Sequence, residues 1–159
     1  MTTTPDRDAS RVTIQPATRA DLLGVFRIEQ ASFPQPWPFT AFEGFLDTPG
    51  FLVAHHDGEV VGYVVADTVP NYGGQIGHVK DFAVSAAYRR HGIGRRLLDR
   101  AIALLEGRGV RRIRLEVRQS NDVAISLYRA FGFQQRHVLA GYYENGEHAI
   151  VMVRDTPLG

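Results

Sequence analysis

The chain has 159 residues, 44% of them hydrophobic, which suits a single domain with one buried core. Lysine and arginine number 18 against 17 aspartate and glutamate, so a net charge of +1 gives no overall field for nucleic acid or a membrane surface. The absence of cysteine excludes disulfides, thiolate metal sites and a cysteine nucleophile. Any catalysis must therefore use oxygen or nitrogen groups.

Both ends of the chain are polar. Residues 1–10 lack the apolar stretch of a signal peptide, and no apolar run approaches the roughly 20 residues that span a bilayer. We therefore expect a soluble cytoplasmic protein, a monomer or weak dimer, that binds neither nucleic acid nor membrane. The expected domain covers 11–154, with tails at 1–10 and 155–159.

The first half of the chain predicts helices followed by a meander of strands. Thr18 is a plausible N-cap for the first helix, and three prolines exclude a helix over 33–38. Asp57-Gly58 is a signal for a tight hairpin. The expected elements are a strand at 12–14, helices at 18–31 and 40–46, and strands at 51–56, 59–66 and 78–84.

The second half alternates between helix and strand. Apolar residues at helical spacing begin at Ile93, and the helix is expected to end near Gly107 and Gly109. Charge alternates with apolar residues over 112–118. Ser120 or Asn121 can cap a further helix. The expected elements are helices at 93–107 and 121–131, and strands at 112–118, 133–139 and 148–153. The whole pattern predicts an α/β fold, with a mixed sheet covered by helices.

A glycine-rich turn joins the strand at 78–84 to the helix at 93. Such a turn presents free backbone amides at the positive end of a helix dipole, which suits a phosphate group. Gly92 and Gly94 lack a Cβ, so phosphate oxygens can approach the main chain. Four arginines add positive potential: Arg89, Arg90, Arg95 and Arg96. The alternative is an ordinary strand-to-helix turn, because a short motif alone does not distinguish the two.

Several segments in order resemble the GNAT superfamily of acetyltransferases. The acetyl-CoA signature of that family is Arg or Gln, two residues, Gly, one residue, Gly or Ala, and Arg89, Gly92 and Gly94 match it. The signature region comprises Phe82-Ala83-Val84, Tyr88-Arg89-Arg90-His91-Gly92-Ile93-Gly94 and Leu97-Leu98. Further segments resemble the RimI-type subfamily, the ribosomal-protein-alanine N-acetyltransferases: Leu115-Glu116-Val117-Arg118, Ser120-Asn121, Ala124-Ile125, Leu127-Tyr128, Gly132-Phe133, Tyr142-Tyr143 and Glu147-His148-Ala149.

The resemblance implies a GNAT fold, with a mostly antiparallel sheet, helices on both faces, and acetyl-CoA in a splay between two central parallel strands. It implies cofactor contacts from Phe82, Ala83, Val84, Arg89, Arg90, His91, Gly92, Ile93, Gly94, Arg95 and Asn121. Backbone groups near 82–84 are expected to bond the pantetheine and polarise the thioester carbonyl. Asn121 has a second possible role as a helix cap.

Two residues are the candidate catalytic groups. Glu116 is expected on the strand face opposite the apolar residues, where its carboxylate could accept an ammonium proton. The alternative is a surface ion pair with Arg114 or Arg118, although Glu116 matches the general base of the resembling subfamily. Tyr128 matches the tyrosine that, in the resembling family, protonates the departing thiolate. Its alternative role is that of a core aromatic.

Aromatic residues are the candidates for acceptor binding. In the resembling subfamily the first inter-helix loop and the last hairpin flank the acceptor groove, which implies acceptor contacts from Trp37, Tyr142 and Tyr143. These residues and Phe39 could instead be core or rim aromatics. No metal site is expected, because His55 and His56 fall on opposite strand faces without a carboxylate-rich ligand set.

The sequence therefore predicts direct acetyl transfer, in a ternary complex with acetyl-CoA, to the α-amine of a protein such as a ribosomal protein. The alternatives are acetylation of lysine or a small amine, and a catalytically silent acetyl-CoA sensor.

Overall fold

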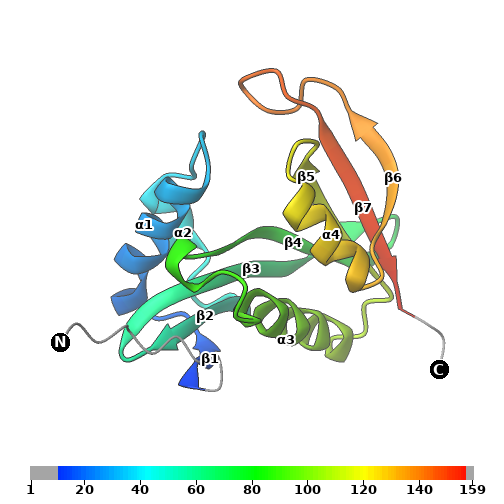
Figure 1. Cartoon of the computed structure of the whole chain (residues 1–159). Helices are drawn as coiled ribbons and strands as arrows, with labels where there is room; N and C mark the ends of the chain where they lie inside the picture. Colours follow the sequence, from blue (N-terminus) through cyan, green and yellow to red (C-terminus); the bar gives the residue numbers. More distant parts are fainter. Residues whose placement is uncertain (1–10, 157–159) are drawn as a thin grey trace.

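The computed structural model describes residues 11–156, which form one sheet with helices on both faces (Figure 1). Its strands are β1 (Thr13–Pro16), β2 (Gly50–His56), β3 (Glu59–Asn71), β4 (Gly74–Val84), β5 (Arg112–Arg118), β6 (Gln134–Leu139) and β7 (Ala149–Asp155). Its helices are α1 (Leu22–Ser32), α2 (Phe39–Gly44), α3 (Ile93–Gly107) and α4 (Asp122–Ala130), with 3-10 turns η2 (Arg19–Asp21) and η3 (Ala86–Tyr88). The mixed α/β fold that the sequence predicts is confirmed.

The centre of the sheet holds a parallel pair of strands. The strand order is β1-β2-β3-β4-β5-β7-β6, and β4 and β5 are parallel because α3 forms the crossover between them. The two strands pair at Gly77–Ile113, His78–Arg114 and Val79–Leu115 and then separate, although both continue for several residues. Their carboxyl ends therefore splay, and ligands commonly bind at such a point in a parallel sheet.

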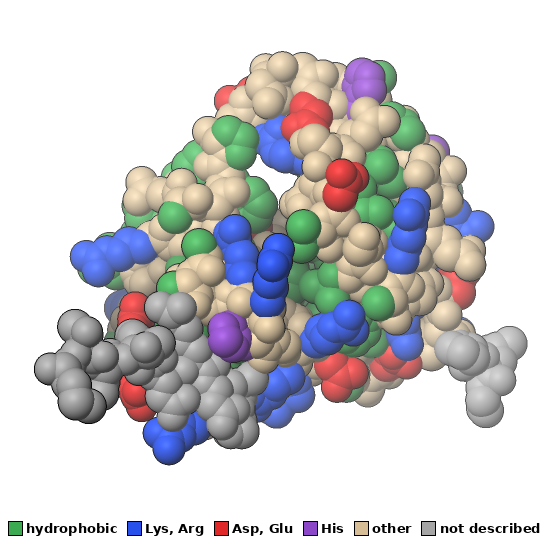
Figure 2. Space-filling view, viewed as in Figure 1, with side chains coloured by type: hydrophobic (Ala, Val, Ile, Leu, Met, Phe, Trp, Pro, Cys, Tyr) green, Lys and Arg blue, Asp and Glu red, His purple; other side chains and the backbone are tan. Residues whose placement is uncertain are grey.

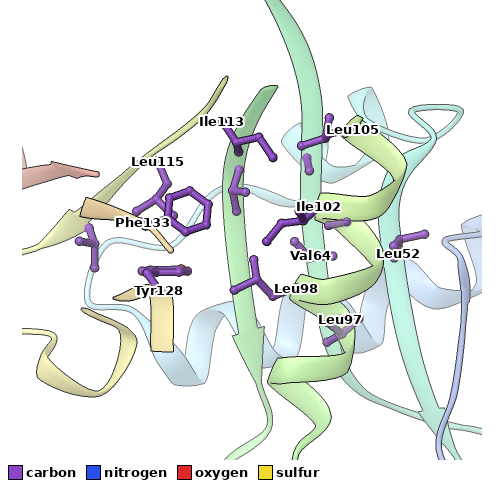
Figure 3. Close-up of a cluster of buried hydrophobic side chains, with 14 of the residues drawn as sticks. Leu52, Val64, Leu97, Leu98, Ile102, Leu105, Ile113, Leu115, Tyr128 and Phe133 are labelled. Carbon is purple, nitrogen blue, oxygen red and sulfur yellow. The ribbon is translucent and has the colours of Figure 1, made fainter. Parts of the chain in front are cut away.

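One face of the sheet is covered by α3 and α4. The buried residues of α3 recur every three or four positions, as in an amphipathic helix: Ile93, Leu97, Leu98, Ala101, Ile102 and Leu105. Figure 3 shows this stripe beside the strands, in one cluster with Tyr128 of α4 and Phe133. Each buried leucine or isoleucine side chain contributes about 1.5–3 kcal/mol to stability when it is removed from water. The stripe therefore fixes how α3 lies on the sheet.

The other face is covered by α1 and α2. Phe42 of α2 is buried against Tyr63 of β3, with ring centroids 5.7 Å apart. Trp37 packs on Phe42 at 5.4 Å and on Phe45 at 5.6 Å. The segment 33–38 contains neither helix nor strand, as its three prolines predict. Aromatic packing thus holds an irregular segment against the sheet.

The β3–β4 hairpin is longer than the sequence predicts. The strands were expected at 59–66 and 78–84, but they continue to Asn71 and begin at Gly74. Tyr72 and Gly73 form a tight turn with φ of 41° and 83°. The extension is exposed or half-buried over most of its length, so it lacks the alternation of apolar residues by which strands are recognised.

Element ends differ from the predictions in smaller ways. Thr18 caps η2, not α1: its backbone N–H donates to Asp21 Oδ2 at 2.8 Å. Phe131 follows α4 as its C-cap. Asp155, expected in the C-terminal tail, is the last residue of β7 and bonds Arg112 at 2.8 Å.

The expected tail at 1–10 and the last three residues lie outside the described residues. No helix within residues 11–156 combines the length and the apolar character needed to cross a membrane.

Candidate active site

A cavity of about 1190 Å³ opens where β4 and β5 separate. Its walls come from the segment before α2, the ends of β4 and β5, the first turns of α3 and α4, and the β6–β7 loop. Figure 2 shows an opening between the side that carries α1 and α2 and the side that carries β6 and β7. A site for a single drug-sized ligand usually has about 300–1,000 Å³, so this cavity lies above that range.

The N-terminus of α3 forms one end of the cavity. Gly92, its N-cap, has φ of 79°, a left-handed conformation that glycine adopts without strain. The Arg96 N–H is bonded to the Gly92 carbonyl at 3.1 Å, so the N–H groups of residues 93–95 precede the first helical hydrogen bond. Arg89 Nε donates to the Val84 carbonyl at 3.1 Å and ties the turn to β4. This geometry suits an anion such as phosphate.

Most of the predicted cofactor-binding residues lie together here. Those that line the cavity are Phe82, Ala83, Val84, Arg89, Arg90, Gly92, Ile93, Gly94, Arg95 and Asn121. His91 is exposed and is not among the lining residues. At Gly94, an added Cβ would lie 3.1 Å from the Phe82 ring. Glycine at this position therefore lets β4 and the first turn of α3 approach closely.

Asn121 caps α4. Its Oδ1 accepts a hydrogen bond from the Ala124 N–H at 3.2 Å, as the capping alternative predicts. Because Asn121 also lines the cavity, the predicted cofactor contact is compatible with the capping role.

Glu116 lines the cavity, and its side chain is 16% exposed. Its Oε2 is 2.7 Å from His78 Nε2, and its Oε1 is 3.2 Å from Arg114 Nε. Burial alone would raise the pKa of Glu116, but the hydrogen bond and charge of His78, with Arg114 and Lys80, lower it below its ordinary value. Of the two arginines considered from sequence, Arg114 is the ion-pair partner. Glu116 is therefore ionised at neutral pH.

His78 is a site residue that sequence reasoning missed. Its Nδ1 lies 3.4 Å from Lys80 Nζ. An ionised carboxylate can only accept, so the His78 Nε2 that faces Glu116 carries a proton and donates it in the hydrogen bond. The parallel pairing of His78 with Arg114 brings this histidine beside Glu116, and no local motif marks that contact.

Tyr128 is a core aromatic that also lines the cavity. Its ring packs between Phe82, at 6.2 Å, and Phe133, at 5.8 Å, and it belongs to the core cluster (Figure 3). The residue is 6% exposed and also lines the cavity. Burial, with the nearby charge of Asp81, raises its pKa above the ordinary value of 10.0. The phenol is therefore protonated at neutral pH.

The predicted acceptor-binding aromatics lie at the other end of the cavity. Trp37, Tyr142 and Tyr143 all line it, whereas Phe39 packs on Phe26 at 5.8 Å and is not a lining residue. Tyr142 and Tyr143 form an edge-to-face pair at 5.0 Å, and Tyr142 is 54% exposed. Residues from two separate loops therefore form one aromatic rim.

A buried group of acids that the sequence did not reveal lies below this rim. The Tyr63 hydroxyl donates to Glu29 and lies 3.4 Å from Asp81, while the Trp37 N–H donates to Glu29 at 2.8 Å. Burial, with the nearby Glu29, raises the pKa of Asp81 well above its ordinary value. Asp81 Oδ1 also accepts the Phe82 N–H at 2.9 Å. This bond occupies the Phe82 N–H, and the expectation that backbone groups near residues 82–84 bind the pantetheine and the thioester carbonyl stays a prediction.

The paired histidines have structural partners. His55 Nε2 lies 2.7 Å from Asp21, and His56 Nδ1 lies 3.3 Å from the Tyr88 hydroxyl. Across residues 11–156, no group of three or more histidine and acidic side chains is placed to hold a metal ion.

Comparison with known proteins assigns this chain to a family. The sequence profile of the acetyltransferase (GNAT) family matches residues 22–133. The N-alpha-acetyltransferase RimI of Mycobacterium tuberculosis is 36% identical, over 94% of this chain and 96% of that protein. An N-alpha-acetyltransferase of Sulfurisphaera tokodaii is 35% identical, over 87% of this chain and 90% of that protein. The crystal structure of the ribosomal-protein-S18-alanine N-acetyltransferase of Escherichia coli matches with a TM-score of 0.80 and 30% identity, covering 93% of this chain and 96% of the other.

The family match covers β2 to β5, the glycine turn and Glu116. The chain therefore belongs to the GNAT family and is an acetyl-CoA-dependent N-acetyltransferase.

Proposed function

We propose that this chain acetylates the N-terminal α-amine of a protein, with a ribosomal protein as the natural acceptor, by direct transfer in a ternary complex. One observation carries the proposal: a single cavity joins the amide-lined turn at α3 to Glu116, Tyr128 and an aromatic rim. Relatives named N-alpha-acetyltransferase and a structural neighbour named for ribosomal protein S18 support the choice of acceptor. No covalent enzyme intermediate is needed, because the α3 turn and the candidate acceptor-binding residues line the same cavity.

The first step is removal of a proton from the acceptor. Glu116 is ionised and faces the cavity, so it accepts one proton from the acceptor ammonium, directly or through water. The N–H of His78 stabilises the carboxylate before it accepts that proton. The neutral amine then attacks the thioester carbonyl, a carbon–nitrogen bond forms, and the carbon–sulfur bond breaks.

The second step is protonation of the leaving group. Tyr128 donates its phenolic proton to the departing thiolate, and the second proton of the acceptor nitrogen restores the phenol. Its raised pKa keeps the phenol protonated before the reaction, as a general acid must be. Glu116 finally releases its proton to solvent. The products are the acetylated amine, the free thiol of CoA and one proton.

Proton chemistry favours an α-amine over lysine as the acceptor. An α-amine has a pKa near 7.7 to 8.0 and lysine near 10.4, so at pH 7.4 about 30% of the former and about 0.1% of the latter is neutral. The pKa of Glu116 is lowered, which makes it a modest base. A modest base is enough for an α-amine, whereas lysine needs stronger help.

Matched peptides test this proposal. One set carries a free N-terminus, with alanine first, and a blocked lysine; the other carries a blocked N-terminus and a free lysine. Thiol release measures the rate, and mass spectrometry locates the acetyl group. We expect the free N-termini to be modified faster. Faster modification of lysine peptides would favour the lysine alternative, and the absence of acceptor-dependent thiol release would favour a silent sensor.

A further inference from the structure

Arg118, the last residue of β5, lies two positions after Glu116 and lines the same cavity. Its side chain is 12% exposed, which is unusual for an arginine unless its donors are satisfied. The groups that satisfy them come from two different loops. These loops carry the aromatic residues at the rim of the acceptor end.

The first partner of Arg118 lies in the segment before α2. Arg118 Nη2 donates to Gln35 Oε1 at 2.9 Å. Gln35 is two residues before Trp37, whose backbone N–H is itself bonded to buried Glu29 at 2.8 Å. This side of the cavity is thus attached both to α1 and to the end of β5.

The other partners lie in the β6–β7 loop. Arg118 Nη1 donates to Glu147 Oε1 at 3.0 Å and to Asn145 Oδ1 at 3.3 Å. The centre of its guanidinium lies 3.9 Å from the Tyr143 ring centroid, within the range of a cation–π contact. One planar group therefore holds the loop by two hydrogen bonds and an aromatic face.

A single guanidinium thus connects both sides of the opening seen in Figure 2. Exposed ion pairs contribute little to stability, so the bonds of Arg118 would hold the two loops only weakly if its side chain were exposed to solvent. Here the arginine is largely buried and uses its planar, forked set of donors, which a lysine cannot reproduce. Arg118 is consequently a direct link between the two loops, and it is fixed to the strand of Glu116.

We propose that Arg118 is a positioning residue for the acceptor: it holds Trp37 and Tyr143 at the separation that brings a chain terminus to Glu116. This inference rests on the proposed function. Arg118 need not touch the reacting atoms. It acts through the two loops, so its loss affects recognition of the peptide more than binding of acetyl-CoA at the α3 turn.

Two variants, Gln35→Ala and Arg118→Lys, test the link from either end. Gln35→Ala removes one partner from an irregular segment, and Gln30→Ala, at an exposed position of α1, is the matched control. We expect each test variant to raise KM for the acceptor peptide about tenfold, the loss that accompanies a missing hydrogen bond to a charged group. The larger part of the loss should fall in KM for the peptide rather than in kcat. KM for acetyl-CoA should stay within about twofold of wild type.

A double-mutant cycle separates this role from a merely structural one. If Gln35 acts through Arg118, the double variant should lose no more kcat/KM than Arg118→Lys alone. Losses that multiply, or a peptide KM unchanged in Gln35→Ala, would overturn the inference. If the wild-type chain is active and both variants have the same KM for the peptide as the wild type, this inference alone is wrong. A wild type that acetylates no acceptor overturns the proposed function as well.

Discussion

The imidazole Nε2 of His78 lies 2.7 Å from the carboxylate of Glu116, although 38 residues separate them in the chain. The contact joins β4 to β5 at the end of their paired region, where the cavity begins. His78 gives Glu116 a hydrogen-bond donor in a partly buried place, which keeps the carboxylate ionised and oriented.

Replacing Glu116 with glutamine should lower kcat by roughly 100-fold or more, as expected when a general base is lost. Glutamine has almost the same shape and can still accept a hydrogen bond from His78. Steady-state thiol release with a peptide acceptor measures the effect, and calorimetry should show unchanged affinity for acetyl-CoA. Wild-type turnover in the folded variant would remove Glu116 from the mechanism.

Replacing His78 with leucine should shift the acidic limb of the kcat/KM profile to higher pH. The hydrogen bond and charge of His78 lower the pKa of Glu116, while burial raises it. Without His78 the pKa of Glu116 rises, so the carboxylate becomes protonated, and inactive as a base, at a higher pH than in wild type. His78→Gln, which retains an N–H donor, should shift the limb less. Superimposable profiles for the three proteins would contradict the role given to His78.

Tyr128→Phe should lower kcat by roughly 100-fold or more without loss of the fold. The ring between Phe82 and Phe133 is retained, so the melting temperature should change little, while the proton for the thiolate is lost. Leaving-group dependence provides the sharper check. An acetyl thioester of a thiol with lower pKa needs less protonation and should recover part of the lost rate. Equal losses for both thioesters would indicate a structural role for the hydroxyl.

Gly94→Glu should weaken binding of acetyl-CoA by at least tenfold. The new carboxylate enters the first turn of α3, where it repels phosphate and where an added Cβ lies 3.1 Å from Phe82. Gly107→Glu is the matched control, because this glycine ends the same helix with no neighbouring atom within 4 Å of an added Cβ. Calorimetry on both folded variants measures the affinities. Unchanged affinity in Gly94→Glu would mean that the cofactor phosphates bind elsewhere.

The sequence by itself determined the elements whose patterns are local. The apolar stripe of α3 and the alternation along β5 predict both elements at their observed bounds, because a residue's face in a helix or strand depends only on the period. Gly92 and Gly94 mark the turn before α3, because backbone conformation and close approach are also local properties. The placement of Glu116 opposite the apolar face of β5 follows from the same alternation.

Only the tertiary structure decided which distant residues meet. His78 reaches Glu116 because α3 returns the chain so that β4 and β5 pair in parallel at one register. A shift of one residue would turn a different side chain toward Glu116. Glu29, Tyr63 and Asp81 come from three elements and share no motif. Arg118, a possible partner of Glu116 in the sequence, instead binds Gln35 and Glu147, because two loops far apart in the chain converge over its strand. Such contacts depend on packing and register, which no local period encodes.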